Sequence, residues 1–250
     1  VPKEEDEIRR NLEQLAEELV WAETEIVIDS LGRFQGGSES AFVELTNRLA
    51  NEAKSEFVIE TAYYIPAQEG IDNVAEMTER GVRVRILTNS LRSNNHTTVH
   101  AHYKKYRKKL IEAGVELYEL RPDPEILERF KETHQEVGES RAGLHSKSFV
   151  VDRRFSMIGS YNMDPRSRIW NSEIGLLIDS KGFAEKVLEI MESDLDPANS
   201  YRVTLDEKGN LVWTAEDDGN PVTWDKEPET TAWQRFKSRF LRWIPMEKEL

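Results

Sequence analysis

The stretch Gly143–Glu173, GLHSKSFVVDRRFSMIGSYNMDPRSRIWNSE, is the feature that most restricts what this chain can fold into. Its two short apolar runs, FVV and FSMI, are separated by a polar turn at Asp152–Arg154. This pattern predicts two buried strands joined by that turn. Alternate residues of a strand share a face, so His145 and Lys147 should project to the same side.

The polar residues of this stretch follow a fixed spacing. His145, Lys147 and Asp152 form the pattern H-x-K-x4-D. Six residues later comes G-S-x-N, from Gly159 to Asn162. By residue frequencies, the full pattern arises by chance on the order of once in a million chains or less. An imidazole beside a fixed ammonium, followed by hydroxyl and amide groups, is what a phosphoryl-transfer site requires.

A lone H-x-K carries no such meaning, and the chain contains one. His102 and Lys104 repeat the pair, but Lys109 stands where the aspartate should be and no G-S-x-N follows. We therefore expect His102 to be a helix-surface residue. We expect the nearby His100 to be a histidine that packs a helix.

Outside this stretch, short strands and helices alternate along the chain. Strands are expected over 24–29, 56–63, 82–87, 115–120 and 173–180, and helices over about 38–54, 70–80, 96–113, 124–136 and 182–194. Ser38 is expected to cap the first of these helices. The alternation predicts an α/β fold, in which a central mixed β-sheet is flanked by helices on both faces.

The two ends of the chain differ from this pattern, which suggests three segments. They are 1–37, a helix, strand and linker; 38–200, the catalytic lobe; and 201–250, a hairpin followed by an amphipathic helix. The last helix, over about 230–244, combines aromatic and basic residues. Docking on its own domain is the favoured interpretation of this helix, and contact with an anionic membrane surface is the alternative.

Composition restricts the class of protein. The 250 residues carry a net charge of −13 and no cysteine, which excludes disulfides and a thiol nucleophile. The acidic balance weighs against a nucleic-acid partner. No run of about 18 apolar residues occurs, so we expect no transmembrane helix. The chain opens with VPKEEDE and lacks an initiator methionine and a signal peptide, which suggests a processed or truncated start.

The combined pattern resembles the signature of the phospholipase D superfamily, which is called the HKD motif. The runs RGVRVRILTNS, LHSKSFVVDRR, NMDPRSRIWNSEIGLLID and RFKSRFLRWIPMEKEL resemble the C-terminal half of bacterial phospholipase D-like proteins of the cardiolipin synthase C type. The resemblance covers almost the whole chain from about Leu19 onward.

This resemblance implies a role for each matching residue. The implied catalytic residues are His145, Lys147, Asp152 and Glu173, and the implied phosphate ligands are Lys147, Ser160 and Asn162. His145 would be the catalytic imidazole, and Glu173, 28 positions later, would orient it. Asp152 would support the site structurally or electrostatically. The scheme uses no metal, and the sequence offers no ligand cluster for one, so no metal or other cofactor is expected.

Members of the group that this chain resembles carry two HKD motifs, and this chain has one. Transfer through a phosphohistidine needs a second imidazole to protonate the leaving alcohol and activate the incoming one. We therefore expect a partner, either a missing N-terminal HKD lobe or a second copy in a homodimer. The missing histidine would then be the nucleophile and His145 the general acid and base.

The function implied is transfer of a phosphatidyl group between phospholipids, by a lobe that is incomplete alone. The implied location is peripheral, on the cytoplasmic face of a bacterial inner membrane, or otherwise the cytoplasm. A phosphodiesterase or nuclease of the same superfamily is the first alternative. An inactive isolated half-domain is the second.

Overall fold

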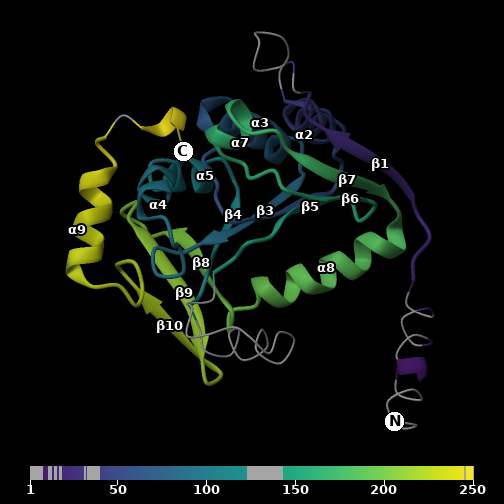
Figure 1. The fold of residues 1–250 in the computed structure, drawn as a ribbon. Helices are drawn as coiled ribbons and strands as arrows, with labels where there is room; N and C mark the ends of the chain where they lie inside the picture. Colours follow the sequence, from purple (N-terminus) through teal and green to yellow (C-terminus); the bar gives the residue numbers. More distant parts are fainter. Residues whose placement is uncertain are drawn as a thin grey trace.

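The computed structural model describes residues 8–10, 13, 16, 19–30, 32, 40–122, 143–244 and 246–249. Within them, one sheet contains all ten strands, in the order β1-β7-β6-β5-β2-β3-β4-β8-β9-β10 (Figure 1). The strands are β1 (Glu23–Ile28), β2 (Glu56–Thr61), β3 (Arg83–Asn89), β4 (Glu116–Leu120), β5 (Lys147–Val151), β6 (Phe155–Gly159), β7 (Ile174–Asp179), β8 (Ser200–Leu205), β9 (Leu211–Asp217) and β10 (Asn220–Trp224). The helices are α2 (Ala41–Glu52), α3 (Ala67–Glu79), α4 (Thr97–Tyr103), α5 (Arg107–Glu112), α7 (Pro165–Ile169), α8 (Lys181–Leu195), α9 (Ala232–Leu241) and the 3₁₀ turn η2 (Glu247–Glu249).

The sheet is mixed, as the sequence predicts. β2 pairs in parallel with β3, and β3 with β4, while β5, β6 and β7 run antiparallel to their neighbours. In each parallel pair, helices connect the two strands: α3 joins β2 to β3, and α4 with α5 joins β3 to β4. This is the usual way to join parallel strands, because the connection must cross the sheet.

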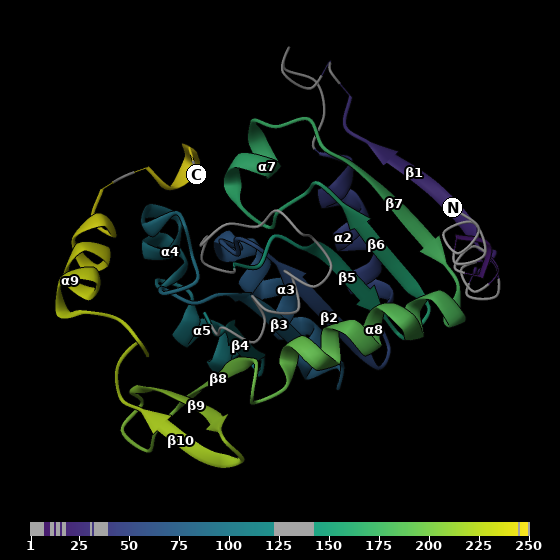
Figure 2. The ribbon, with the colours of Figure 1, turned by 60° about the horizontal axis from the view of Figure 1, so that its bottom comes forward.

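Helices cover both faces of the sheet. On one face, α2 and α3 pack on a core that contains Phe42, Phe57 and Phe149. On the other face, α8 packs Leu188 and Met191 against the alternate residues of the central strands. Figure 2 shows α8 crossing the strands on the side opposite α2 and α3. The α/β architecture with helices on both faces is therefore confirmed.

Several element boundaries differ from the sequence prediction. Helix 96–113 is two helices, α4 and α5, separated by a turn at Lys104–Tyr106. The cap of α2 is Ser40, and Ser38 lies outside the described residues. The expected helix over 124–136 also lies outside them, as do many residues of the helix expected within 1–37. Strand β1 lies in the expected segment 1–37, and strands β8–β10 cover residues 200–224, at the start of the expected segment 201–250. All four strands belong to the same sheet as the strands between them.

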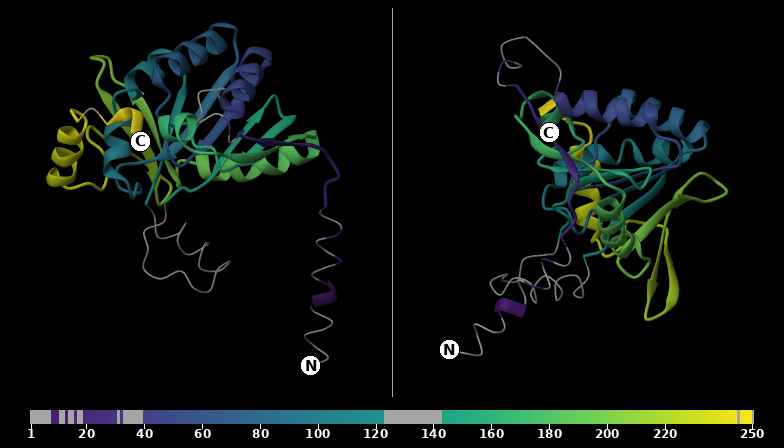
Figure 3. Two further views of the ribbon diagram at one scale, coloured as in Figure 1. Left: turned by 45° about the horizontal axis from the view of Figure 1, so that its top comes forward. Right: turned by 90° about the vertical axis from the view of Figure 1, so that its right-hand side faces the viewer.

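The last helix packs on its own domain, as the favoured interpretation predicts, but its aromatic side faces away from that domain. In α9 the side chains of Trp233, Phe236 and Phe240 are exposed, and Ser238 is the buried residue. α9 packs beside α4 at the margin of the molecule (Figures 1 and 3). No helix within the described part of the chain is long and apolar enough to cross a membrane.

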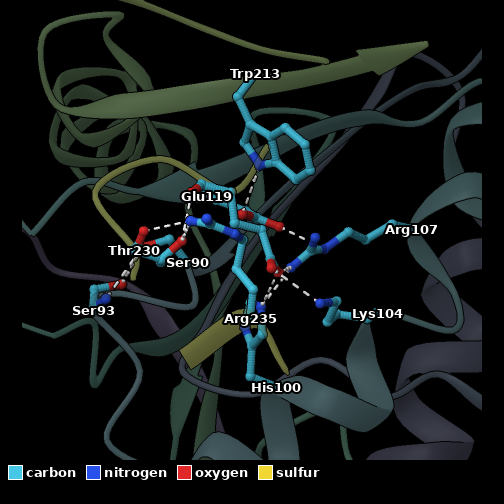
Figure 4. Close-up of polar contacts among 10 residues, drawn as sticks. Ser90, Ser93, His100, Lys104, Arg107, Glu119, Trp213, Thr230 and Arg235 are labelled. Carbon is cyan, nitrogen blue, oxygen red and sulfur yellow. Dashed lines mark hydrogen bonds and ion pairs between the residues drawn. The ribbon is translucent and has the colours of Figure 1, made fainter. Parts of the chain in front are cut away.

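His100 and His102 are both buried, and His100 belongs to a buried network of charged residues. Both have 0% of their area exposed, so the surface position expected for His102 is wrong. Arg107 lies between the carboxylates of Glu119, at 2.8 Å, and Glu227, at 2.9 Å. The ring of His100 also contacts Glu227, at 3.2 Å. Figure 4 shows this network, which ties the segment before α9 to α4 and α5.

Candidate active site

Three antiparallel strands bring His145, Lys147 and the Gly159–Asn162 segment to one end of the sheet. β5 begins at Lys147, β6 ends at Gly159 and β7 begins at Ile174. The register pairs Ser148 with Ile158 and Gly159 with Gly175. Because neighbouring strands run in opposite directions, the start of β5, the end of β6 and the start of β7 lie at the same end of the sheet.

His145 and Lys147 lie side by side at this end of the sheet. The ammonium of Lys147 is 3.5 Å from both ring nitrogens of His145 and donates a hydrogen bond to the His145 carbonyl at 2.9 Å. The imidazole is exposed, whereas the lysine is half-buried. The pair therefore presents an imidazole ring and a fixed positive charge to a ligand bound at this end of the sheet.

The surroundings of His145 favour the neutral form of its imidazole. The charge of Lys147, followed by partial burial, lowers the pKa of His145 below its ordinary value. Burial lowers the pKa of Lys147, while the carboxylates of Glu173 and Asp164 act in the opposite direction. A neutral imidazole can accept a proton or attack phosphorus, so this pairing suits a base or nucleophile at neutral pH.

Ser160 and Glu173 form the second part of the site. The Ser160 hydroxyl donates a hydrogen bond to the Glu173 carboxylate. The same oxygen accepts a hydrogen bond from the Ile174 backbone amide at 3.0 Å. The other Glu173 oxygen accepts from the Asn171 amide at 3.0 Å. Glu173 makes no hydrogen bond with His145 among the described residues, so its orienting role stays a prediction.

Glycine allows the two strands to approach closely at this point. A Cβ added to Gly159 would lie 2.5 Å from the Ile174 carbonyl oxygen and 2.7 Å from the Gly175 Cα. Any side chain at position 159 would force β6 and β7 apart, and this would break the hydrogen bond from Ser160 to Glu173. This contact explains the glycine of the G-S-x-N sequence.

Asn162 has an unsatisfied polar atom. Its side-chain oxygen is buried and has no hydrogen-bond partner in the described structure, while its backbone amide donates to Ser167 at 3.3 Å. Nearby, Asp164 caps α7 by accepting the Ser167 amide at 2.8 Å. Burial raises the pKa of Asp164 to about 6. An unsatisfied buried amide oxygen costs free energy. This oxygen is an acceptor, so only the amide nitrogen of Asn162 could donate to a phosphate oxygen.

Asp152 lies apart from the other motif residues. It follows the opposite end of β5 and accepts hydrogen bonds from the backbone amides of Lys54, Ser55 and Glu56, at 2.8–3.2 Å. The Ser55 hydroxyl also donates to it at 2.8 Å. These bonds lower the pKa of Asp152, against an opposing effect of burial. The structure therefore does not bring Asp152 to His145, and its contacts are those of a residue that holds a loop.

Two polar residues that the sequence analysis missed position the site. Asn89, at the end of β3, accepts the Leu144 amide and donates to the Leu144 carbonyl, both at 2.9 Å, and it also donates to Ala62. It thereby fixes the segment that leads into His145. Asp29 accepts the Glu173 amide at 3.2 Å and the Ser40 hydroxyl at 2.9 Å. In the sequence, Asn89 and Asp29 are recognisable only as polar residues at the end of an apolar stretch, which does not predict these contacts.

A polar hollow of about 500 Å³ opens beside His145. Asn94, Asn95 and Thr97, from the segment that leads into α4, line it. Among the described residues, no group of three or more His, Asp or Glu side chains is placed to hold a metal ion. The hollow is large enough for the polar part of a small substrate.

More than half of the chain matches a known protein family. Residues 47–195 match the family described as cardiolipin synthase, PLD-like domain. The chain belongs to this family. The match spans β2 to α8 and therefore includes every strand that meets at the His145 end of the sheet. The phospholipase D-like domain predicted from the HKD motif is confirmed.

Two curated relatives show the extent of the likeness. Cardiolipin synthase C of Escherichia coli K12 is 33% identical over 234 residues, which are 92% of this chain and 48% of that protein. Cardiolipin synthase A of Proteus mirabilis is 32% identical over 155 residues, 62% of this chain and 27% of that protein. This phospholipase D-like chain thus spans half or less of the length of these relatives.

Two solved structures share the fold. The Nuc protein of Salmonella typhimurium, a phospholipase D family member, superposes with a TM-score of 0.52 at 20% identity, over 73% of this chain and 99% of that one. Phosphatidylserine synthase of Haemophilus influenzae superposes with a TM-score of 0.51 at 14% identity, over 88% of this chain and 45% of that one. Both support the phospholipase D fold.

Proposed function

We propose that this domain is one catalytic lobe of a phosphatidyltransferase that moves a phosphatidyl group between phospholipids by way of a phosphohistidine. The observation that carries the proposal is the pairing of exposed His145 with the Lys147 ammonium, 3.5 Å from both of its ring nitrogens. Likeness to cardiolipin synthase C over 92% of the chain supports a phospholipid substrate.

In the proposed reaction, Lys147 and Asn162 hold the phosphate. A histidine on a second lobe attacks phosphorus, forming a P–N bond as the bond to the leaving alcohol breaks. The negative charge of the bound phosphodiester favours the protonated form of His145, which gives its proton to the leaving oxygen and becomes neutral. It then takes the proton of the incoming hydroxyl, which attacks phosphorus and releases the second histidine. Lys147 stabilises the charge that develops on the non-bridging oxygens.

The proposal requires a second lobe, and an exposed apolar patch on the sheet supports this requirement. Exposed apolar side chains form a patch on one face of β1, β6 and β7; they are Ile26, Ile28, Ile158, Ile174 and Leu176. The register pairs Leu176 with both Ile26 and Ile158, so they form a continuous row. This apolar face adjoins the site, because the amide of Ile174 donates to Ser160. A contiguous apolar surface of this kind is typical of an interface.

The test is transfer of the phosphatidyl group, measured with phosphatidylglycerol and phosphatidylethanolamine vesicles. We expect little activity from the domain alone. We expect activity on adding the separately made half of cardiolipin synthase C that carries the other HKD motif, and its loss with His145→Ala or Lys147→Gln. Transfer by the domain that persists in His145→Ala contradicts the catalytic assignment.

The same experiment separates the alternatives. A phosphodiesterase would release the alcohol without forming a new phosphodiester, so water would replace the acceptor lipid in the products. A nuclease would degrade DNA in a Lys147-dependent manner that falls steeply with salt. Either product pattern, without lipid transfer, contradicts the phosphatidyltransferase.

A further inference from the structure

Helix α9 presents its aromatic side chains to solvent. Trp233 and Phe236 stack on one another with ring centroids 5.7 Å apart, and 68% and 59% of their areas are exposed. Phe240 is 62% exposed, and Trp243, in the turn after the helix, is 76% exposed. Large apolar side chains normally face the protein in a helix of a soluble domain. Here the orientation is reversed.

The helical geometry makes these residues a single ridge. At about 100° per residue, Trp233, Phe236 and Phe240 lie within about 60° of one another around the axis of α9. Lys237 and Arg239, both exposed, flank the ridge on its two sides. Ser238, which is fully buried, lies on nearly the opposite side, where α9 packs against α4. We call Trp233, Phe236, Phe240 and Trp243 the aromatic ridge.

The charge of this segment is opposite to that of the whole chain. Residues 232–244, AWQRFKSRFLRWI, contain four basic residues and no acidic one, whereas the chain carries a net charge of −13. Arg242 also lies over the ring of Trp243, at 5.6 Å from its centroid. A local positive surface on an acidic protein selects an anionic partner.

Contacts that do not involve the aromatic ridge hold α9 in place. Thr231 and Gln234 form a capping box at its start. Arg235 donates to the backbone and the hydroxyl of Thr230. Just before it, Glu227 belongs to the buried network of Arg107 and Lys104 (Figure 4). The ridge is therefore free to contact a partner while the helix stays anchored to the domain.

We propose that α9 docks this domain on the surface of a bilayer that contains anionic lipids. The aromatic ridge enters the interface between headgroups and acyl chains, and the flanking Lys237 and Arg239 bind lipid phosphates. Tryptophan is favoured at this interface because its ring is apolar and its N–H is polar. Basic residues on either side of an apolar stripe are the pattern of helices that lie in a membrane surface.

A membrane fits this ridge better than a second protein does. A protein interface that buried four aromatic side chains would also have to desolvate the two cations beside them, which is costly without matched carboxylates. At a bilayer surface the cations stay at the level of the headgroups. The position of α9 also connects the proposed membrane contact with the candidate active site. Helix α4, on which α9 packs, begins at Thr97, which lines the hollow beside His145.

Vesicle binding tests this proposal without any catalysis. The intact domain would be sedimented with phosphatidylcholine vesicles that contain either no phosphatidylglycerol or about one-third of it. We expect binding to the anionic vesicles, at least about ten-fold tighter than to the neutral ones. W233S/F236S/F240S/W243S should weaken binding at least about thirty-fold. K237E/R239E should weaken it at least about twenty-fold, from about five-fold for each basic residue lost.

Two controls and one spectroscopic measurement make the result specific. K54E/K181E changes the net charge equally at exposed lysines elsewhere and should leave binding within about two-fold. His145→Ala should bind as the parent does, so failure of the proposed reaction leaves this proposal intact. Brominated lipids should quench tryptophan fluorescence in the parent, and W233F/W243F should lose most of that quenching. Equal binding by the aromatic-ridge variant, equal binding to neutral vesicles, or no quenching overturns the proposal.

Discussion

Lys147 and Asp152 act at opposite ends of the same strand. Lys147 opens β5 beside His145, whereas Asp152 follows the last residue of β5 and accepts the backbone amides of Lys54, Ser55 and Glu56. The aspartate of the HKD motif therefore joins the β5–β6 turn to the loop before β2. Its backbone φ of 51° is in the left-handed region, which aspartate tolerates better than most residues.

Replacement of Asp152 by asparagine should destabilise the domain and leave its chemistry intact. The amide side chain would keep the shape of the carboxylate but lose the charge that strengthens these hydrogen bonds, at a cost of about 2 kcal/mol in the free energy of unfolding. The pKa of Asp152 is lowered, so its contribution is present above the ordinary carboxyl pKa and is lost as pH falls through the folded value.

Urea unfolding at pH 7 and pH 3 measures this effect. The difference between the parent and Asp152→Asn should shrink at the lower pH. Asp225→Asn, at an exposed position, is the matched control and should change little. A stable Asp152→Asn domain that has lost transfer activity in the complemented assay argues instead for a role in the reaction.

Lys147→Gln should raise the pKa of His145 toward its ordinary value. The Lys147 charge is the largest cause of the lowered pKa, and partial burial, the second cause, remains in the variant. Removing the charge favours the protonated imidazole, so less of the neutral base exists near pH 6. Titration of labelled histidine by NMR measures the shift, with His145→Ala to assign the resonance.

A control separates this local effect from net charge. Lys108→Gln removes one exposed positive charge from α5 and should leave the His145 titration unchanged. An identical His145 pKa in the parent and in Lys147→Gln means that the two side chains do not interact in solution.

Glu60→Gln should stabilise the domain at alkaline pH. Glu60 is buried on β2, and burial, with Asp194 as the second cause, raises its pKa from 4.5 to about 7. The folded state thus retains a proton that the unfolded chain has lost, and the contribution of this carboxyl to stability declines as pH rises from about 4.5 to 7. Glutamine is neutral throughout, so the variant avoids this loss.

Urea unfolding at pH 5 and pH 8 checks this prediction. The advantage of Glu60→Gln over the parent should grow by about 1–3 kcal/mol between the two values. Glu185→Gln, at an exposed position on α8, should give no such change. A Glu60→Gln variant that is less stable at pH 8 shows that the charged carboxylate is needed.

Leu176→Glu should prevent the second lobe from restoring activity. Leu176 lies in the exposed apolar row with Ile26 and Ile158, so a carboxylate there would be buried unpaired in the proposed interface. Stability of the domain alone should change by less than about 0.5 kcal/mol, because the side chain is exposed. The measurement is phosphatidyl transfer as a function of added lobe, with thermal unfolding alongside.

Ile190→Glu supplies the comparison. Ile190 is exposed on α8, away from this row, and its substitution should leave complementation unchanged. Full activity of Leu176→Glu at the parent's lobe concentration places the interface elsewhere.

Local patterns predicted the parts of the fold that depend on neighbours in sequence. Two short apolar runs predicted β5 and β6, and the H-x-K spacing predicted that His145 and Lys147 lie together. The break between α4 and α5 was missed because residues 96–113 are helical in character throughout. Lys105 and Tyr106, in the turn there, bind Glu247, a residue more than 140 positions later.

The residues of the site divide in the same way. The family and the α/β architecture could be predicted from the sequence, because spacing and periodicity are local properties. The sequence did not predict that Asp152 holds a distant loop, that Asn89 and Asp29 position the site, or that the aromatic side chains of α9 face solvent. Each of these depends on which backbone amides or side chains a residue meets across the fold, and such contacts join residues far apart in the chain.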